Sequence, residues 1–367
     1  MARTRLCFVG VLPRPVTGMT LATEAVLEKV AGEVDTDVFA IRRPTGIGNG
    51  LWVLYKHCAF QLGVFFLAWC RLRGTRSSYI VAESGKGLVS TLVLTSAARL
   101  FGMRILMHHH VFSYVNETNR LMQAVVTVAG ARAQHIFLCD LMMQKFTERY
   151  ACPGASIVLS NAYLVEAPDP SQPAPTDDAR DNPSPLADKL RLGFLGNITR
   201  SKGIDLCVDA FEQLAGEHRE LELHVAGPVA EPGLEELLSR AKDNYPDRFD
   251  YLGPVYGDDK RAFFEGIDLL VFPTRYRNEA QPLTIFEAAA HGVPTVAFGI
   301  GCIEQQVEGI GWSVNDKDGL ESIIRDCLTN PQNLADRRKR TRARFDDAQQ
   351  TSSEQLGDIV RQLQGSA

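Results

Sequence analysis

The sequence predicts an α/β protein of two domains, each a Rossmann-like, doubly wound parallel β-sheet, which face each other across a cleft. The chain has 367 residues, and a domain commonly holds about 100–200. Short β-branched runs alternate with longer helical patterns, as they do where crossover helices join parallel strands. One proline-rich stretch interrupts this alternation and divides it into halves of similar size. The binding site is expected in the cleft, at the carboxyl ends of the strands.

The first domain is expected over residues 1–165. Its strands are short apolar runs at Leu6–Leu12, Val38–Ile41, Tyr79–Ala82, Arg104–His108, His135–Cys139 and Ile157–Leu159. Helical patterns lie between them at Thr20–Ala31, Leu51–Leu72, Leu88–Phe101, Asn119–Ala131 and Leu141–Tyr150. Asp35, Thr36 and Asp37 form a DxD that precedes a strand instead of following one, so we expect a solvated turn there and no metal–diphosphate site.

Residues 166–189 are expected to form an exposed linker, because they hold six of the 18 prolines. The second domain follows over residues 190–345. Its strands are predicted at Arg191–Leu195, Leu221–Ala226, Phe249–Leu252, Leu269–Phe272, Thr295–Phe298 and Trp312–Val314. Its helices are predicted at Ile204–Ala215, Pro232–Tyr245, Asp259–Glu265, Leu283–Ala290 and Gly319–Leu328. Two last helices are predicted at Leu334–Phe345 and Ser352–Leu363, and residues 346–367 are expected to pack back on the first domain.

Charge and cysteine content exclude some classes of function. The 39 basic and 44 acidic residues give a net charge of −5, which argues against a nucleic-acid-binding protein. The eight cysteines form no CxxC pair, and several stand in apolar runs. We therefore expect buried, reduced thiols in a cytoplasmic protein, and no structural zinc.

Two segments bear on membrane contact. Leu51–Cys70 is apolar but shorter, between its charges, than the roughly 20 residues that a spanning helix needs. It is interpreted as a buried helix of the α/β domain; the alternative is a helix against the bilayer, flanked by Arg71, Arg73 and Arg76. The run RRKRTRAR at residues 337–344 is expected to be a solvated helix face, with contact to an anionic membrane as its alternative.

The most informative segment is DLLVFPTRYRNEAQPLTIFEAAAHGVPTVAF, residues 268–298. A strand runs into a polar loop, and a helix begins near Pro282. Glu279 precedes this helix and Glu287 lies within it, eight residues on, which is just over two turns, so both carboxylates can face one cleft. The first N–H groups of the helix, at Leu283 and Thr284, favour an anion. A functional role is therefore preferred over two solvated surface carboxylates.

A second segment, LGFLGNITRSKG at residues 192–203, places a glycine loop between a strand and a helix. Gly196 permits close backbone approach to a ligand, while Arg200 and Lys202 stand where they could neutralise a diphosphate. The spacing is not that of a P-loop.

The loop GVLPRPVTGM, residues 10–19, follows the first strand, and Gly18 opens the next helix. It is either a plain turn or a set of backbone donors for a phosphate or an acceptor. His108, His109 and His110 end a strand, where neighbouring side chains point to opposite faces and so do not chelate a metal together. His110, nearest the loop, is the histidine expected to face the cleft as a hydrogen-bond donor.

Together these segments resemble the retaining glycosyltransferases of family 4, which have the GT-B architecture of two Rossmann-like domains. The likeness is strongest over residues 192–328, where Glu279 and Glu287 match the E-x7-E motif and EAAAHGVPTVA matches the helix and strand after it. It is weaker in VLPRPVTGM, LMHHHVFSYV and VLSNA. Many members carry an arginine directly after the glycine of the phosphate loop; here Asn197 stands there, and Arg200 is expected to substitute for it.

The resemblance implies three catalytic residues. Glu279 would contact hydroxyls of the transferred sugar, Lys202 would neutralise the donor diphosphate, and His110 would line the sugar side of the cleft. Glu287 would bind the ribose, and Gly253–Tyr256 would lie near the base. The further substrate-binding residues are Gly18, Asn197, Arg200, Gly227, Val255, Tyr256, Ala280, Gln281, Pro282, Leu283 and Thr284.

The expected reaction is transfer of a sugar, with retention, from a nucleotide diphosphate sugar to a hydroxyl of a saccharide or lipid-linked saccharide. Bacterial polysaccharide or glycolipid synthesis at the inner face of the cell membrane is the expected setting. No metal cofactor is expected, because cations and helix N-termini can stabilise the leaving diphosphate. The alternatives are a sugar-nucleotide epimerase of the same architecture and a non-catalytic nucleotide-sugar-binding subunit.

Overall fold

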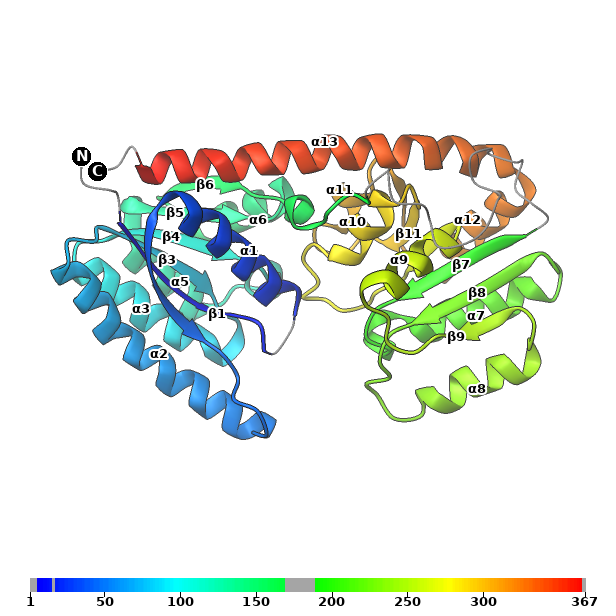
Figure 1. The fold of residues 1–367 in the computed structure, drawn as a ribbon, viewed down its shortest axis with the longest axis horizontal. Helices are drawn as coiled ribbons and strands as arrows, with labels where there is room; N and C mark the ends of the chain where they lie inside the picture. Colours follow the sequence, from blue (N-terminus) through cyan, green and yellow to red (C-terminus); the bar gives the residue numbers. More distant parts are fainter. Residues whose placement is uncertain (1–4, 15–16, 169–188, 365–367) are drawn as a thin grey trace. The chain divides into compact units, whose positions relative to one another are not determined.

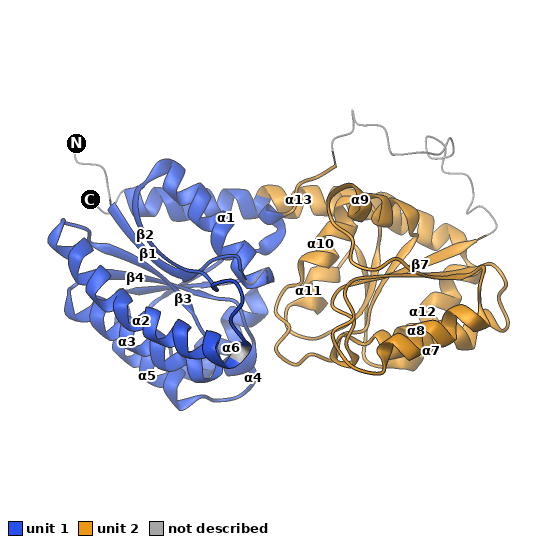
Figure 2. Cartoon of the chain, turned by 60° about the horizontal axis from the view of Figure 1, so that its bottom comes forward, with its two compact units in different colours: residues 1–164, 351–367 blue, residues 165–350 orange. Residues whose placement is uncertain are grey.

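The computed structural model of the chain describes residues 5–14, 17–168 and 189–364 (Figure 1). The chain forms two compact units, Met1–Leu164 with Thr351–Ala367 (unit 1) and Val165–Gln350 (unit 2), drawn in two colours in Figure 2. Most of the predicted linker, residues 169–188, lies outside the described residues.

Unit 1 is built on a six-stranded parallel sheet of order β2-β1-β3-β4-β5-β6. The strands are β1 (Arg5–Val11), β2 (Asp35–Ile41), β3 (Ser77–Ala82), β4 (Arg104–His109), β5 (Ala133–Phe137) and β6 (Ala155–Val158). The helices are α1 (Gly18–Glu33), α2 (Asn49–Leu72), α3 (Leu88–Leu100), α4 (Ser113–Asn116), α5 (Arg120–Ala129) and α6 (Asp140–Tyr150).

Unit 2 repeats the design with a parallel sheet of order β12-β11-β10-β7-β8-β9. The strands are β7 (Leu190–Leu195), β8 (Leu221–Ala226), β9 (Phe249–Tyr251), β10 (Leu269–Phe272), β11 (Thr295–Phe298) and β12 (Gly311–Val314). The helices are α7 (Ile204–Ala215), α8 (Leu234–Asn244), α9 (Gly257–Gly266), α10 (Leu283–Ala290), α11 (Ile303–Val307), α12 (Lys317–Thr329) and α13 (Pro331–Gln364), of which α13 continues into unit 1.

Each sheet is covered on both faces, which explains why its strands read as nearly continuous apolar runs. In unit 1 one face packs on α1 and on the end of α13, through buried residues such as Val26, Leu356 and Val360. In unit 2 one face packs on α7, α8 and α12, and the other on α9 and α10, the latter through Phe263, Phe264 and Ala288. The predicted α/β class with two parallel sheets is confirmed.

The start of β2 differs from the prediction. Asp35, Thr36 and Asp37 were expected in a solvated turn, but they are the first residues of the strand and pair with β1. Arg5 binds the Asp35 carboxylate at 3.0 Å and Arg73 binds that of Asp37 at 2.9 Å. These ion pairs neutralise the two carboxylates, so the strand extends through a segment of low β-propensity.

The two predicted C-terminal helices are one, α13, which is unbroken in Figure 1. Neither proline nor glycine stands between Phe345 and Ser352, so no residue there stops the helix. Residues 351–364 belong to unit 1, where Gln362 accepts a hydrogen bond from Gln134 at 2.8 Å.

The basic run in α13 is the expected solvated face only in part. Lys339, Arg340 and Arg344 are exposed, but the other three arginines are bound to neighbouring residues. Arg337 stacks on Trp312, with 4.5 Å from its guanidinium carbon to the ring centroid. Arg338 binds Asp268 at 2.6 Å, and Arg342 donates to the carbonyl of Ala290 at 2.7 Å. These three arginines therefore fasten α13 to unit 2.

The interpretation of Leu51–Cys70 as a buried helix is wrong. Gly50–Leu72 is long and apolar enough to cross a membrane, with a mean hydropathy of 1.4, yet only 17% of its apolar window is buried. Cys7, Cys70, Cys207 and Cys327 are free, buried thiols, Cys152 is free and half-buried, and Cys58, on this helix, is free and exposed. Composition does not reveal which face of an apolar helix is covered, because that depends on the neighbouring elements.

Candidate active site in unit 2

The segment after β7, residues 196–203, is shaped by glycines. Thr199 accepts a hydrogen bond from the N–H of Lys202 at 3.2 Å and caps a short 3-10 turn, Arg200–Lys202. Gly203 then has a φ of +82°, and a Cβ there would lie 2.1 Å from the carbonyl oxygen of Pro273. Only glycine fits this position, so the turn that presents Lys202 is held against the end of β10.

Three further glycines meet at the carboxyl ends of neighbouring strands. A Cβ at Gly227, after β8, would lie 1.9 Å from the carbonyl oxygen of Gly196, after β7. The N–H of Gly227 donates to Gly253, after β9, at 2.8 Å. The contact between the loops after β7 and β8 is therefore by itself a reason for glycine at position 227. Beyond Gly253, Val255 is half-buried and Tyr256 is 74% exposed.

Lys202 and Glu279 come together although 77 residues separate them. The ammonium of Lys202 donates to the Glu279 carboxylate, and the two side chains are 25% and 12% exposed. Thr274, fully buried after β10, donates to the same carboxylate at 3.4 Å. The rings of Phe272 and Tyr276 lie 5.7 and 5.6 Å from the Lys202 nitrogen. The pair is thus partly desolvated, which strengthens its electrostatic interaction.

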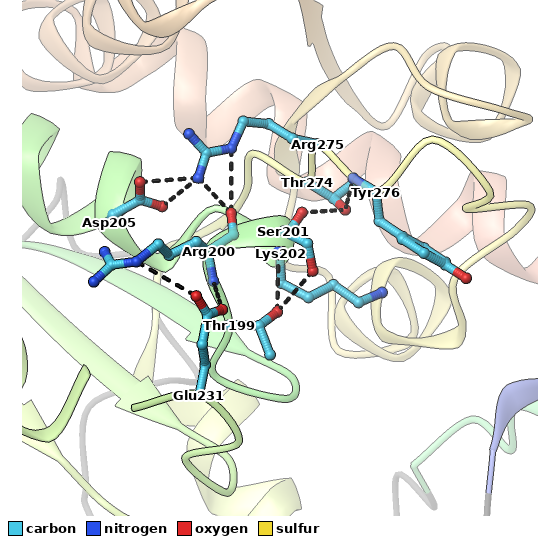
Figure 3. A network of polar contacts seen from close by, with 9 residues as sticks. All are labelled: Thr199, Arg200, Ser201, Lys202, Asp205, Glu231, Thr274, Arg275 and Tyr276. Carbon is cyan, nitrogen blue, oxygen red and sulfur yellow. Dashed lines mark hydrogen bonds and ion pairs between the residues drawn. The ribbon is translucent and has the colours of Figure 1, made fainter. Parts of the chain in front are cut away.

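Arg200 is not brought to this pair. Its guanidinium binds Glu231 at 3.4 Å, and its backbone N–H donates to the same carboxylate at 2.8 Å. Its carbonyl accepts from Arg275, which also binds Asp205 at 2.7 Å. In Figure 3 the Arg200 side chain points to Glu231, and that of Lys202 runs the opposite way. Asn197, in the preceding loop, is exposed.

Helix α10 presents its amino end directly after Glu279. Pro282 is the N-cap and supplies no side-chain cap, so the first N–H groups, at Leu283 and Thr284, are not satisfied by a cap. Both residues are half-buried. One turn further on, the Glu287 carboxylate binds Lys260 of α9 at 2.5 Å. Lys260 was not predicted, since nothing in its local sequence marks it.

A segment around α11 holds the loop between β10 and α10. A Cβ at Gly301 would lie 2.1 Å from the carbonyl oxygen of Glu279. Cys302 donates its N–H to the carbonyl of buried Ala280 at 2.9 Å, and Gln306 donates to that of Pro282 at 2.9 Å. Gln281 is also buried. Ala280, Gln281 and Pro282 thus position the site through their backbone, and Gly301 and Gln306 are supports that sequence reasoning missed.

A cavity of about 410 Å³ lies beside the site, along α9. Val255 lines it together with Leu252, Pro254 and Phe263. Neither Lys202, Glu279 nor Glu287 is among its lining residues. Its apolar walls suit a flat ring more than a charged group.

Two predicted residues belong to unit 1. Gly18 is the first residue of α1, and a Cβ there would meet no atom within 4 Å, so the fold itself does not require glycine. His110 follows β4 and is 6% exposed; burial lowers its pKa to about 3, so the ring is neutral at neutral pH. Its Nε2 has no hydrogen-bond partner among the described residues. A neutral, buried and unsatisfied imidazole is suited to hydrogen bonding and not to carrying charge.

Residues 189–330, which include Lys202, Glu279 and Glu287, match the family Glycosyl transferases group 1. This part of the chain is similar to group 1 glycosyl transferases. The lipopolysaccharide core biosynthesis mannosyltransferase LpsB of Rhizobium meliloti (strain 1021) is 26% identical over 200 residues, which are 52% of this chain and 56% of that protein. The chain spans about a fifth to about half of the length of the curated relatives that it matches.

Solved structures extend the likeness from the group 1 domain to the whole chain. Sucrose-phosphate synthase of Thermosynechococcus elongatus matches over 100% of both chains, with a TM-score of 0.70 and 17% identity. Anabaena Alr3699/HepE in complex with UDP-glucose matches over 96% of this chain and 99% of that one, with a TM-score of 0.61 and 17% identity. At these identities the likeness shows the fold, and the expected GT-B architecture of two Rossmann-like units is confirmed.

Proposed function

We propose that the protein is a retaining glycosyltransferase that uses a nucleotide diphosphate sugar. The observation that carries the proposal is the Lys202–Glu279 pair, set between a glycine-shaped turn and the uncapped amino end of α10. The ammonium and the N–H groups without a side-chain cap are suited to a diphosphate, and the carboxylate is suited to sugar hydroxyls. A diphosphate sugar presents these two kinds of group next to each other.

The nucleotide part of the donor would lie over α9 and α10. Glu287, held by Lys260, would accept hydrogen bonds from the ribose hydroxyls, and the base would lie near Gly253–Tyr256. The match of residues 189–330 to the group 1 family supports this assignment. A structural neighbour of the whole chain is described in complex with UDP-glucose, which favours UDP as the first nucleotide to test.

In the proposed reaction the bond between the anomeric carbon and the diphosphate oxygen breaks, and a bond to the acceptor oxygen forms on the same face of the sugar. The proton of the acceptor hydroxyl passes to the departing phosphate oxygen. Lys202 and the amino end of α10 stabilise the charge that develops on the diphosphate. These groups need no metal ion to do so. Neutral His110, on unit 1, would donate a hydrogen bond to the sugar.

The acceptor is proposed to be a hydroxyl of a saccharide or lipid-linked saccharide, as in the synthesis of bacterial polysaccharides or glycolipids. The similarity to LpsB, named for lipopolysaccharide core biosynthesis, supports this class. The reaction would take place on the cytoplasmic side of the membrane, where nucleotide sugars are available.

The test is to incubate the pure chain with UDP-, GDP- and other sugar nucleotides, to record thermal stabilisation and release of the nucleotide, and to repeat this with chelator present. Stabilisation by one donor, with nucleotide release that survives the chelator, supports the proposal. NMR of the product then reports the anomeric configuration. Conversion of the donor into an epimer without acceptor would instead identify an epimerase, and binding without turnover in the presence of acceptors would identify a sensor subunit.

A further inference from the structure

Helix α2 carries a continuous apolar stripe on its exposed face. Leu51, Tyr55, Cys58, Leu62, Phe65, Trp69 and Leu72 recur at alternating spacings of four and three residues and are all exposed. Phe65 is 73% exposed and Leu72 is 88% exposed. Leu51 and Leu72 are 21 positions apart, so the stripe is about 31 Å long. An apolar surface of this extent marks an interaction site on a protein, because single exposed apolar residues are normally scattered.

The opposite face of α2 fastens it to unit 1. Trp52, Phe60, Leu67 and Cys70 are buried. Gly63 sits close to α3, since a Cβ there would lie 3.1 Å from Leu94. Figures 1 and 2 show α2 on the outside of unit 1, beside α3. To span a bilayer, α2 would have to give up this packing, so the geometry favours a helix that lies in the plane of an interface.

The surroundings of the stripe carry an excess of positive charge. Between Val38 and Asn116 the chain has one acidic residue, Glu83, which is 5% exposed and bound to Lys56 at 2.7 Å. The same stretch has nine basic residues, of which Arg73 and Arg42 are bound to acids that precede it, Asp37 and Glu24. The nine are Arg42, Arg43, Lys56, Arg71, Arg73, Arg76, Lys86, Arg99 and Arg104. In a chain of net charge −5 this is a strong local asymmetry.

The cations and the apolar groups gather at one end of α2 and α3. Arg71 donates to the carbonyl of Phe101 at 2.9 Å, which joins the carboxyl ends of the two helices. Leu72 and Leu100, 88% and 82% exposed, therefore project near the exposed Arg71, Arg76 and Arg99. Apolar side chains beside arginines are the combination that inserts into a bilayer surface and binds its phosphates.

We propose that the α2 stripe docks unit 1 onto a bilayer that carries anionic lipids. The alternative occupant is a second copy of the chain, because spacings of four and three residues also form helix–helix seams. A symmetric pair would place the same arginines near one another without acids to neutralise them, whereas an anionic bilayer neutralises them. The proposal goes beyond the transferase function, since docking requires neither donor nor acceptor.

The experiment is flotation of the whole chain with phosphatidylcholine vesicles, with and without one third phosphatidylglycerol, at low and high salt. We expect binding that requires phosphatidylglycerol and falls with salt. Phe65→Glu, and separately Arg76→Glu with Arg99→Glu, are each expected to weaken binding at least about tenfold. Leu21→Glu, on α1 in the same unit and 38% exposed, is the matched control and should bind like the wild type.

Three results would overturn the proposal: no binding by the wild type, equal binding with and without anionic lipid, or equal loss in the Leu21→Glu control. A fourth such result would come from sedimentation without vesicles: a dimer of the wild type that Phe65→Glu dissociates. The melting temperature of each variant shows whether it is folded. An increase in that temperature on adding a sugar nucleotide shows whether unit 2 still binds the donor. Vesicle binding without any donor binding would leave this inference intact and remove the transferase proposal.

Discussion

Replacing Lys202 by methionine tests the central contact of the site, because it removes the charge and keeps most of the side-chain volume. It leaves the Glu279 carboxylate, 12% exposed, with a long 3.4 Å hydrogen bond from Thr274. Breaking a fully buried ion pair costs about 3–5 kcal/mol, and an exposed pair contributes about 0.2–1 kcal/mol. Since a quarter of the Lys202 side chain is exposed, we expect the free energy of unfolding to fall by about 1–3 kcal/mol.

Glu279→Gln should be milder than Lys202→Met. It leaves Lys202 between the rings of Phe272 and Tyr276, and a cation retains about 0.5–1 kcal/mol of stabilisation there. The double variant has no unpaired carboxylate, so it should lose less stability than the two single variants added together. We expect a coupling free energy of about 1 kcal/mol or more.

The assays are urea unfolding and steady-state transfer with the donor identified above. In transfer, Lys202→Met should lower kcat/KM by about 100- to 1,000-fold, as loss of one transition-state donor does elsewhere. Lys29→Met, which breaks an exposed Lys29–Glu33 pair in unit 1, is the control and should change stability by less than about 0.5 kcal/mol. Additive stability changes together with an unchanged kcat/KM for Lys202→Met would refute the reasoning.

Three further predictions concern single positions. Gly203→Ala should destabilise the fold by about 1–3 kcal/mol in urea unfolding, because Gly203 has a φ of +82° and a Cβ there would lie 2.1 Å from the Pro273 carbonyl oxygen. Gly18→Ala is the control, since a Cβ there meets no atom within 4 Å, and it should change stability by less than about 1 kcal/mol. Equal effects of the two substitutions would contradict the geometry. Lys260→Met should raise the KM for the donor with little change in kcat, because it removes the partner of Glu287 and leaves the proposed contacts to the diphosphate in place. The measurement is initial-rate kinetics, and a fall in kcat with an unchanged KM would contradict this prediction. Burial lowers the pKa of His110 from 6.5 in the unfolded chain to about 3 in the folded protein, so the unfolded chain binds more protons between these two pH values. Stability should therefore fall as the pH drops from about 6.5 toward 3. His110→Asn should flatten this slope by up to about 1.4 kcal/mol per pH unit, and unchanged slopes in urea unfolding at several pH values would disprove the assignment.

Local patterns in the sequence sufficed for the fold class and for most elements. Strands and helices leave short-range periodicities, and glycine and proline mark where they end, as at Gly203, Pro282 and Gly292. The residues proposed for the site were found in the same way, because Lys202, Glu279 and Glu287 stand at strand-to-helix turns and within a recognisable spacing. The sequence alone thus predicted two parallel sheets and the segments that carry polar groups to their edges.

Pairings between distant residues were decided only by the tertiary structure. Asp35 and Asp37 join β2 because Arg5 and Arg73 neutralise them, and Arg200 turns to Glu231 instead of Lys202. Likewise, no local pattern shows that Lys260 meets Glu287 or that the apolar stripe of α2 faces outward. A sequence pattern reports which side chains share a face of one helix or strand. What covers that face, and which charge meets which, depends on elements brought together from far along the chain by burial of the two cores.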